Sequence, residues 1–152
     1  MCIRDRAYTA TLGHSIEVED TATAILQFRN NALGMIYGST ASFPGQFRRL
    51  EITGTKGTVI QVENSFKVWQ FADHTEKDLE IFNKFNQIEG GGGVSDPGAI
   101  PFEPHAKNIE SFIKSVEAGI PFEIDGPEAR KAVEIILAIY SSARDMKPFY
   151  FS

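Results

Sequence analysis

Cysteine is nearly absent from this sequence, because Cys2 is the only one in 152 residues. A single cysteine excludes a disulfide within the chain and the metal patterns that need several cysteines. No apolar run approaches the roughly 18 residues of a membrane-spanning helix. The first six residues also lack the apolar core of a signal peptide. We therefore expect a cytoplasmic protein without a membrane partner.

Basic residues are also fewer than acidic ones. The chain has 15 Lys and Arg against 20 Asp and Glu, which gives a formal net charge of −5. No basic cluster is longer than a pair, as at Arg48-Arg49 and Arg130-Lys131. This balance argues against nucleic acid as the partner.

The common catalytic and cofactor motifs are missing as well. The sequence contains no H-E-x-x-H, C-x-x-C, G-x-S-x-G or calcium-loop pattern, so no metal site is expected. The four glycines at 90–93 do not form G-x-G-x-x-G, and a proline-rich stretch follows them. The segment Thr53–Thr58 resembles a phosphate loop but has the wrong spacing, and a hairpin turn explains it better.

Alternating side chains dominate the first half of the chain. From Thr21 to Phe28 the pattern has a period of two, which is typical of a strand, and Asn30-Asn31 suits the following turn. Short turns separate this segment from further candidate strands and so predict an antiparallel meander. The other candidates are 7–12, 32–43, 47–53, 58–62, 66–71, 78–82 and 149–151.

Helical periodicity appears only in the second half. Residues 105–117 place apolar side chains on one face, and residues 127–144 form the longest helical pattern. Pro127 suits the first helical position, and the long helix is expected to be buried on more than one side. Strands first and helices last predict an α+β fold, with a mostly antiparallel sheet of five to six strands and two main helices on one face.

Apolar residues are expected on both faces of this sheet. Ile25, Ile36 and Leu50 cannot all share the helix-covered face with the alternate set of apolar residues. Two helices cover only one side of such a sheet, so the other face should meet a protein surface. The sequence therefore predicts a homo-oligomer that forms through the open face.

The candidate site begins after a long stretch without regular structure. Glycines and prolines between 88 and 104 forbid helix and strand, and loops of this length are usually functional or disordered. His105 follows this stretch and opens a helix, where its imidazole can meet an anionic or hydroxylated ligand. The plainer interpretation is a helix-start residue packed by its own loop. His74 is interpreted as solvated, and His14, near Glu17, Glu19 and Asp20, as part of an acidic surface rather than a metal site.

Several motifs occur in an order that resembles a known family. From about residue 7 to its end, the chain is similar to the C-terminal domain of the Gfo/Idh/MocA oxidoreductases, which include glucose–fructose oxidoreductase and inositol dehydrogenase. The motifs are V-E-D-T-A-T-A at 18–24, A-L-G at 32–34, E-I-T-G-T-K-G-T at 51–58, D-G-P-E-A-R-K-A-V at 125–133 and A-I-Y-S-S-A-R at 138–144. G-G-G-G-V-S-D-P at 90–97 and H-A-K-N-I at 105–109 resemble the branch that acts on sugars and sugar nucleotides.

The resemblance implies a two-domain NAD(P)-dependent enzyme. An N-terminal Rossmann domain would hold NAD or NADP, and a lysine with a D-x-x-x-H pair would perform the acid–base chemistry. The C-terminal sheet would supply substrate contacts and the subunit interface. This chain lacks the dinucleotide fingerprint, the E-K-P segment and D-x-x-x-H, since no aspartate stands four residues before His14. No residue is therefore predicted to be catalytic or cofactor-binding.

The first six residues do not resemble the family. We expect residues 1–6 to be foreign or disordered, as in a truncated or misjoined reading frame, and residues 7–152 to be the C-terminal domain. The expected function is substrate binding and oligomerisation within an oxidoreductase for a sugar, sugar nucleotide or polyol, inactive when alone. His105, Asn108 and Arg48 are the predicted substrate contacts.

Two other functions remain open on sequence grounds. The chain can be a free-standing dimeric binding module without catalytic activity. It can also be a small hydrolase or isomerase that pairs His105 with Asp96 or Glu103, which requires those groups within hydrogen-bond reach.

Overall fold

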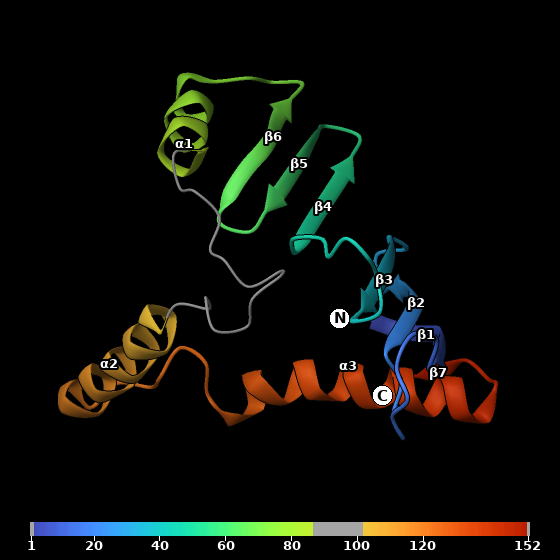
Figure 1. Cartoon of the computed structure of the whole chain (residues 1–152). Helices are drawn as coiled ribbons and strands as arrows, with labels where there is room; N and C mark the ends of the chain where they lie inside the picture. The colour runs from blue at the N-terminus through green and yellow to red at the C-terminus, as the bar shows by residue number, and fades with distance from the viewer. Residues whose placement is uncertain (1, 87–101, 152) are drawn as a thin grey trace. The chain divides into compact units, whose positions relative to one another are not determined.

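The computed structural model describes residues 2–86 and 102–151 (Figure 1). In these residues it contains three helices and two antiparallel sheets, so the predicted α+β class is confirmed. The chain divides into two compact units. The first comprises Met1–Phe43 with Asn108–Ser152, and the second comprises Pro44–Lys107.

The first unit is built on a four-stranded sheet with the order β3-β2-β1-β7. Its strands are β1 (Cys2–Ala10), β2 (Thr21–Phe28), β3 (Leu33–Ser39) and β7 (Phe149–Tyr150). The predicted strand at 21–28 and the turn after it are confirmed, because Asn31 takes the left-handed conformation with φ 65°. Residues Cys2–Arg6 lie in β1, and their foreign origin stays a prediction.

The strand register gives this sheet two different faces. Ala7 lies opposite Ala24, and both side chains are fully buried. Their neighbours in sequence point the other way: Arg6 pairs with Ile25, and Ile25 pairs with Met35. Ile25 is 61% exposed and Met35 is 76% exposed, so the second face is apolar and open.

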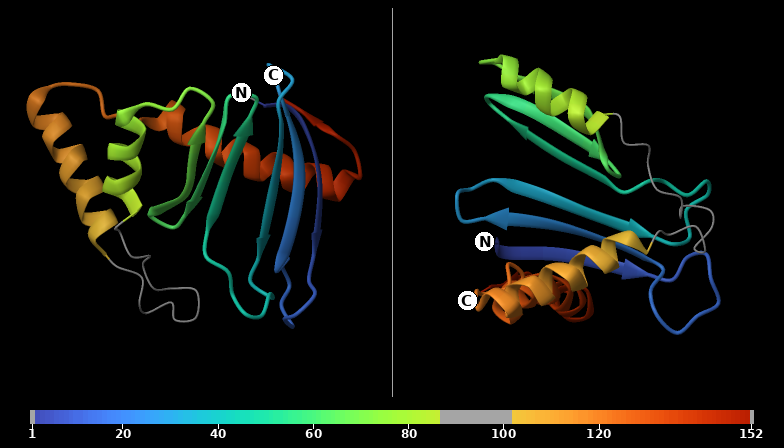
Figure 2. Two further views of the ribbon diagram at one scale, coloured as in Figure 1. Left: turned by 90° about the horizontal axis from the view of Figure 1, so that it is seen from above. Right: turned by 90° about the vertical axis from the view of Figure 1, so that its left-hand side faces the viewer.

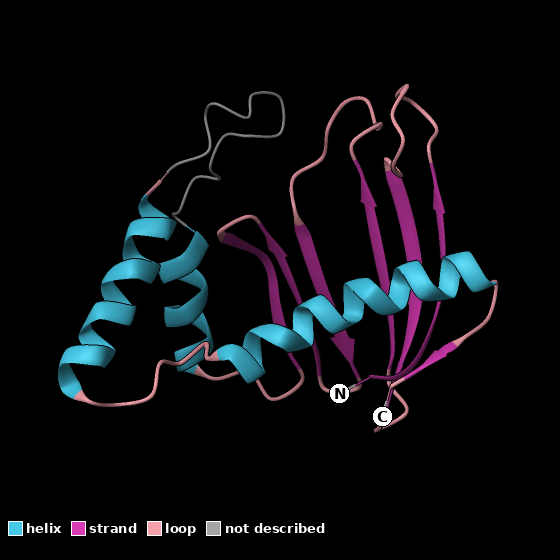
Figure 3. Cartoon of the chain, turned by 90° about the horizontal axis from the view of Figure 1, so that it is seen from below, coloured by secondary structure: helices cyan, strands magenta, loops and turns pink. Residues whose placement is uncertain are grey.

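Helix α3 (Gly126–Asp145) packs against β1 and β7 and crosses the sheet on one side (Figures 2 and 3). The carboxylate of Asp125 accepts the Glu128 N–H at 2.9 Å and caps the helix where the sequence predicts its start. The hydroxyl of Ser142 accepts the Ala7 N–H at 3.1 Å and donates to the Lys147 carbonyl at 2.7 Å. One buried serine thus joins the helix to β1.

Burial of α3 on more than one side is wrong for the structure as described. Only Ala138 and Ser142 of this helix are buried, whereas Val133, Ile136 and Leu137 remain more than half exposed. The reason is geometric, because the helix contacts only β1 and β7 of its sheet appreciably.

The second unit contains a three-stranded sheet with the order β4-β5-β6. Its strands are β4 (Arg49–Gly54), β5 (Gly57–Val62) and β6 (Ser65–Phe71). The predicted hairpin turn between β4 and β5 is confirmed. Gly57 is required there, because a Cβ at this position would lie 2.5 Å from the Gln70 carbonyl oxygen. Instead of the predicted single sheet of five to six strands, the described strands form a four-stranded sheet in the first unit and a three-stranded sheet in the second.

Residues 78–82, predicted as a strand, instead lie within helix α1 (Glu76–Asn86), which packs on β6 (Figure 1). Asp78 caps this helix by accepting the Thr75 N–H at 2.8 Å and the Thr75 hydroxyl at 2.6 Å. The Trp69 indole N–H donates to the same carboxylate at 3.0 Å. This local capping outweighs the short apparent alternation in the sequence.

Helix α2 (Glu103–Ala118) confirms the predicted helix at 105–117. The ring of Phe112 meets that of Phe122 edge to face, with centroids 5.5 Å apart. Gly119, with φ 64°, ends the helix in the left-handed conformation. None of the described helices has the length and apolar character that crossing a membrane would require.

Candidate functional site

His105 and Asn108 both lie in the first half of α2. They are three residues apart, so their side chains share one face of the helix, and both are exposed. The His105 N–H is held by the Phe102 carbonyl at 3.0 Å, which fixes the start of the helix. The structure therefore brings these two predicted contacts together.

Arg48 lies directly before β4, in the second unit. Its N–H donates to the Glu63 carboxylate at 2.9 Å, and its guanidinium lies 3.8 Å from that carboxylate. Part of its positive charge is thus offset by Glu63. Asn108 belongs to the other unit, so a common site for Arg48 and Asn108 stays a prediction.

The hydrolase or isomerase alternative depends on a carboxylate beside His105. Asp96 lies outside the described residues. Glu103 is two positions before His105 in the same helix, and residues at this spacing do not face each other. The pair Glu103–His105 is therefore not favoured.

The loop between β1 and β2 is organised by a buried carboxylate, Asp20, which is 4% exposed. It accepts three backbone N–H groups, from Leu12 at 2.9 Å, Gly13 at 2.8 Å and His14 at 3.0 Å. The Thr21 hydroxyl donates to it at 3.1 Å. The Leu12 and Gly13 amides, more than any other group, hold the pKa of Asp20 far below its ordinary value.

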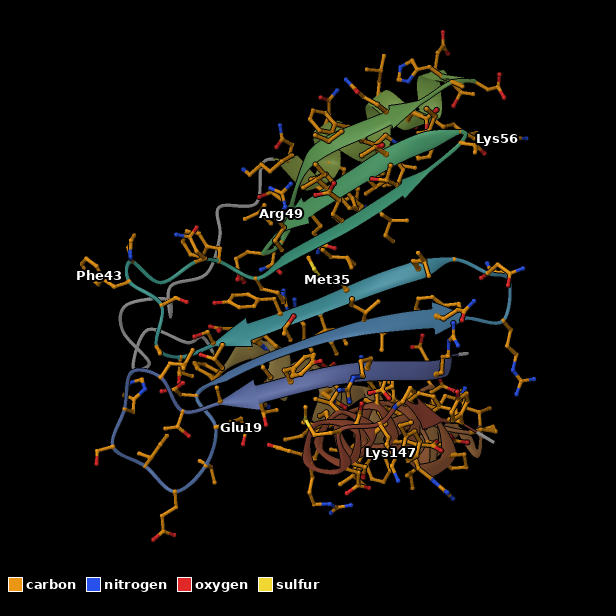
Figure 4. All side chains as sticks on the ribbon, turned by 90° about the vertical axis from the view of Figure 1, so that its right-hand side faces the viewer. Glu19, Met35, Phe43, Arg49, Lys56 and Lys147 are labelled. Atoms are coloured by element: carbon orange, nitrogen blue, oxygen red, sulfur yellow. The ribbon has the colours of Figure 1, made fainter. Side chains whose placement is uncertain are left out.

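His14 shares this loop, with Nδ1 3.2 Å from the Asp20 carboxylate and a side chain that is 46% exposed. Glu19 in the same loop, visible in Figure 4, accepts a hydrogen bond from the Tyr140 hydroxyl of α3. That bond raises the pKa of Tyr140. The sequence predicts acidic surface here, whereas Asp20 is buried. The position of Asp20, between the loop and β2, is the sequence signal of a structured loop.

No cluster of three His, Cys, Asp or Glu suited to a metal ion occurs in the described parts of the chain. Within the described residues, His14 and Asp20 are therefore a pair without a third metal-binding group.

A small cavity of about 260 Å³ lies at one end of the four-stranded sheet. Asp5 lines it and is 2% exposed, and no described group donates a hydrogen bond to either carboxylate oxygen. Burial raises the pKa of Asp5. The backbone N–H groups of Phe149 and of Asp5 itself are near enough to offset part of this rise, but neither reaches hydrogen-bond geometry with the carboxylate. The other lining residues are Arg4, Arg6, Ile25, Leu26, Gln27, Leu33 and Pro148.

Comparison with known proteins gives a consistent result. Residues 3–60 match the family model described as the GFO/IDH/MocA C-terminal domain. This range includes four of the six residues expected to be foreign. The chain is 23% identical to myo-inositol 2-dehydrogenase of Thermotoga maritima over 128 aligned residues. The alignment covers 84% of this chain and 35% of the relative.

Solved structures extend the likeness to nearly the whole chain. The WlbA dehydrogenase of Bordetella pertussis, in complex with NADH and UDP-GlcNAcA, matches with a TM-score of 0.83 and 28% identity, over 99% of this chain and 42% of that one. The WlbA dehydrogenase of Chromobacterium violaceum, in complex with the same two ligands, matches with a TM-score of 0.81 and 28% identity. This match covers 99% of this chain and 40% of that one. The chain thus spans less than half the length of these relatives. Over residues 3–60 by sequence, and over nearly the whole chain by fold, it is similar to the C-terminal domain of the GFO/IDH/MocA family.

Proposed function

We propose that the chain is the substrate-binding and oligomerisation domain of an NAD(P)-dependent oxidoreductase that acts on a sugar, a sugar nucleotide or a polyol. The observation that carries this proposal is the match to the Bordetella pertussis dehydrogenase, whose structure holds NADH and UDP-GlcNAcA. The curated relative from Thermotoga maritima, named for myo-inositol, adds polyols to the substrate class.

The residues of this chain do not fit NAD or NADP. A dinucleotide binds where a parallel strand leads through a glycine-rich turn into a helix. The described strands pair only in antiparallel fashion, and the sequence has no G-x-G-x-x-G. We therefore assign the cofactor to a Rossmann domain elsewhere in the longer protein. Residues 7–152 would then be the second domain, inactive when alone.

Three side chains are proposed to contact the substrate. His105 and Asn108 present an imidazole and an amide on one exposed face of α2, and both groups can bond to hydroxyls. Arg48 offers a guanidinium that suits an acidic group such as a sugar carboxylate. The proposed chemistry is orientation of the ligand, with no proton or hydride transfer assigned to these residues.

The first test is ligand binding by the purified chain, followed by protein-detected NMR. UDP-GlcNAcA is expected to shift signals of α2, and NADH is expected to leave the spectrum unchanged. His105→Ala and Asn108→Ala should each weaken UDP-GlcNAcA binding about tenfold, the effect of losing roughly 1.4 kcal/mol. Glu117→Gln, near the other end of α2, is the matched control. Tight binding of NADH, or equal affinities for all variants, would contradict the proposal.

The open face of the four-stranded sheet is proposed as the surface for a second copy of the chain. Ile25 and Met35, the latter labelled in Figure 4, pair across β2 and β3. Leu33 and Tyr37 each lie two positions from Met35 in β3 and so share its face of the sheet. All four side chains are exposed, and a contiguous apolar surface of this kind usually marks an interface. The continuous sheet offers a flat surface that can pack on a copy of itself.

Sedimentation analysis tests this interface. The chain is expected to form a dimer or larger oligomer, and the double variant Ile25→Asp with Met35→Asp should become monomeric, because it would bury two unpaired charges at the contact. Leu79→Asp on α1, a half-exposed apolar residue of the second unit, should leave the oligomer intact. A wild-type chain that sediments as a monomer at high concentration contradicts the proposed interface.

The same apolar face favours a second candidate, a free-standing dimeric binding module. The two candidates differ in one result. The substrate domain binds a sugar-like ligand through α2, whereas the free-standing module forms the oligomer without such binding.

A further inference from the structure

We infer that His14 is a hydroxyl-binding residue of this domain, with Asp20 as the residue that positions its ring. The inference rests on the proposed function, because the hydroxyl would belong to the sugar-like ligand. It adds a contact in the β1–β2 loop, on a different element from α2.

Asp20 does not need His14 in order to be satisfied. Its two oxygens already accept three backbone N–H groups and the Thr21 hydroxyl. A carboxylate has about four lone-pair sites, so these four donors meet its demand. The imidazole is therefore an additional donor, and the loop would keep its anchor without it.

The contact with Asp20 gives the His14 ring a defined state. A carboxylate beside Nδ1 favours the tautomer that carries its proton on Nδ1. The lone pair of the neutral ring is then on Nε2, which is free to accept a hydrogen bond. Because nearly half of the side chain is exposed, a ligand can reach the ring.

The loop that carries His14 is fixed at several points. The Thr11 hydroxyl donates to the Val18 carbonyl at 2.8 Å, and the Asp20 N–H donates to the Ala10 carbonyl at 3.1 Å. The Tyr140 hydroxyl binds Glu19 and so ties the loop to α3. A residue held in this way loses little freedom when a ligand binds, which favours affinity.

Charge narrows the class of ligand. Glu17, Glu19 and Asp20 place three carboxylates within four positions of this loop. Their field repels phosphate and carboxylate groups, whereas a neutral hydroxyl group can donate to Nε2 without that penalty. The loop is therefore suited to the hydroxyls of a polyol or sugar ring, not to the diphosphate of a sugar nucleotide.

Two substitutions distinguish the roles of Nδ1 and Nε2 of the His14 ring. His14→Asn retains a donor near the position of Nδ1 and loses the acceptor at Nε2. His14→Gln reaches further and retains an amide near the position of Nε2. Both variants should fold, because the anchoring of Asp20 does not depend on the ring, and thermal unfolding checks this.

The experiment uses the chain labelled with ¹⁵N, with myo-inositol and inorganic phosphate as probes at pH 8. Long-range ¹H–¹⁵N spectra should show His14 protonated on Nδ1, and myo-inositol should shift the Nε2 signal while phosphate should not. His14→Asn should weaken myo-inositol binding about tenfold, and His14→Gln by less.

An Nε2-protonated ring, or wild-type affinity in His14→Asn, overturns the assignment while the proposed function stands. If the wild-type chain binds neither myo-inositol nor UDP-GlcNAcA, the proposed function fails, and the role of His14 fails with it.

Discussion

Asp20→Ala is expected to lower the midpoint of thermal unfolding by roughly 10 °C or more. The substitution removes the acceptor of three backbone N–H groups in a loop where Asp20 itself is buried. Buried donors without an acceptor are costly, and the bonds lost here are to a charged group, which are the stronger kind. Circular dichroism measures the midpoint, and Asp73→Ala in an exposed turn is the control.

The Asp20 carboxylate also makes the stability of the folded chain depend on pH. Its pKa is lower in the folded chain than in the unfolded chain, so its contribution to stability is complete above the unfolded pKa and is lost as the pH falls. The wild-type chain should lose stability below about pH 4, the ordinary range of an aspartate. Asp20→Asn should show less of this acid loss. An unchanged acid profile in Asp20→Asn would show that the Asp20 charge does not anchor the loop.

Asp5→Val is expected to act in the opposite direction and to raise the midpoint by roughly 5 °C. Asp5 is buried in β1, and neither carboxylate oxygen has a described hydrogen-bond partner. A buried polar group without a partner costs about 1–3 kcal/mol in proteins, and valine is favoured in strands. Asp73→Val, at an exposed position, should produce no such gain.

The contribution of Asp5 to stability changes with pH in the opposite direction from that of Asp20. Burial raises its pKa, so its pH-dependent destabilising effect is absent below the unfolded pKa, grows as the pH rises from the unfolded to the folded pKa, and is complete above the folded pKa. The gain from Asp5→Val should therefore be larger at pH 7 than at pH 4. Asp5→Asn should flatten this part of the profile without the full gain. A gain that shrinks as the pH rises would contradict an unpartnered carboxylate.

These two aspartates lie in the same unit and differ in their partners. Asp20 belongs to the V-E-D-T motif at 18–21, which resembles the family, and backbone N–H groups satisfy its carboxylate. Asp5 belongs to the first six residues, whose foreign origin stays a prediction, and neither of its carboxylate oxygens has a described hydrogen-bond partner. Native proteins rarely leave a buried carboxylate without a hydrogen bond.

The sequence predicts the individual elements well where one signal dominates. The period-two pattern of Thr21–Phe28 gives β2 with both ends correct, and Pro127 gives the start of α3 to within one residue. In α1 two signals compete, since Asp78–Phe82 alternates like a strand while Thr75 and Asp78 form a helix cap. The cap is local and hydrogen-bonded, and it prevails.

The division into two sheets and the loop site are harder to predict. Strand pairing depends on contacts between distant residues, and no local pattern shows which strands join the four-stranded sheet and which the three-stranded one. Asp20 was interpreted as surface because its sequence neighbours are acidic, whereas its burial depends on the amides of Leu12 and Gly13, eight and seven residues earlier. Helical spacing predicts that His105 and Asn108 lie on the same face of α2. It does not predict where Arg48 lies relative to them, because Arg48 is distant in the sequence.

The most direct measurement is the DNA sequence of the source across the codons for Met1–Ala7 and upstream of them. The proposal that this chain is the substrate domain of a sugar oxidoreductase predicts a reading frame that continues upstream of Ala7. That frame should encode a dinucleotide fingerprint, E-K-P and D-x-x-x-H. A stop codon and a ribosome-binding site directly before Met1 would contradict this account and would favour the free-standing dimeric module.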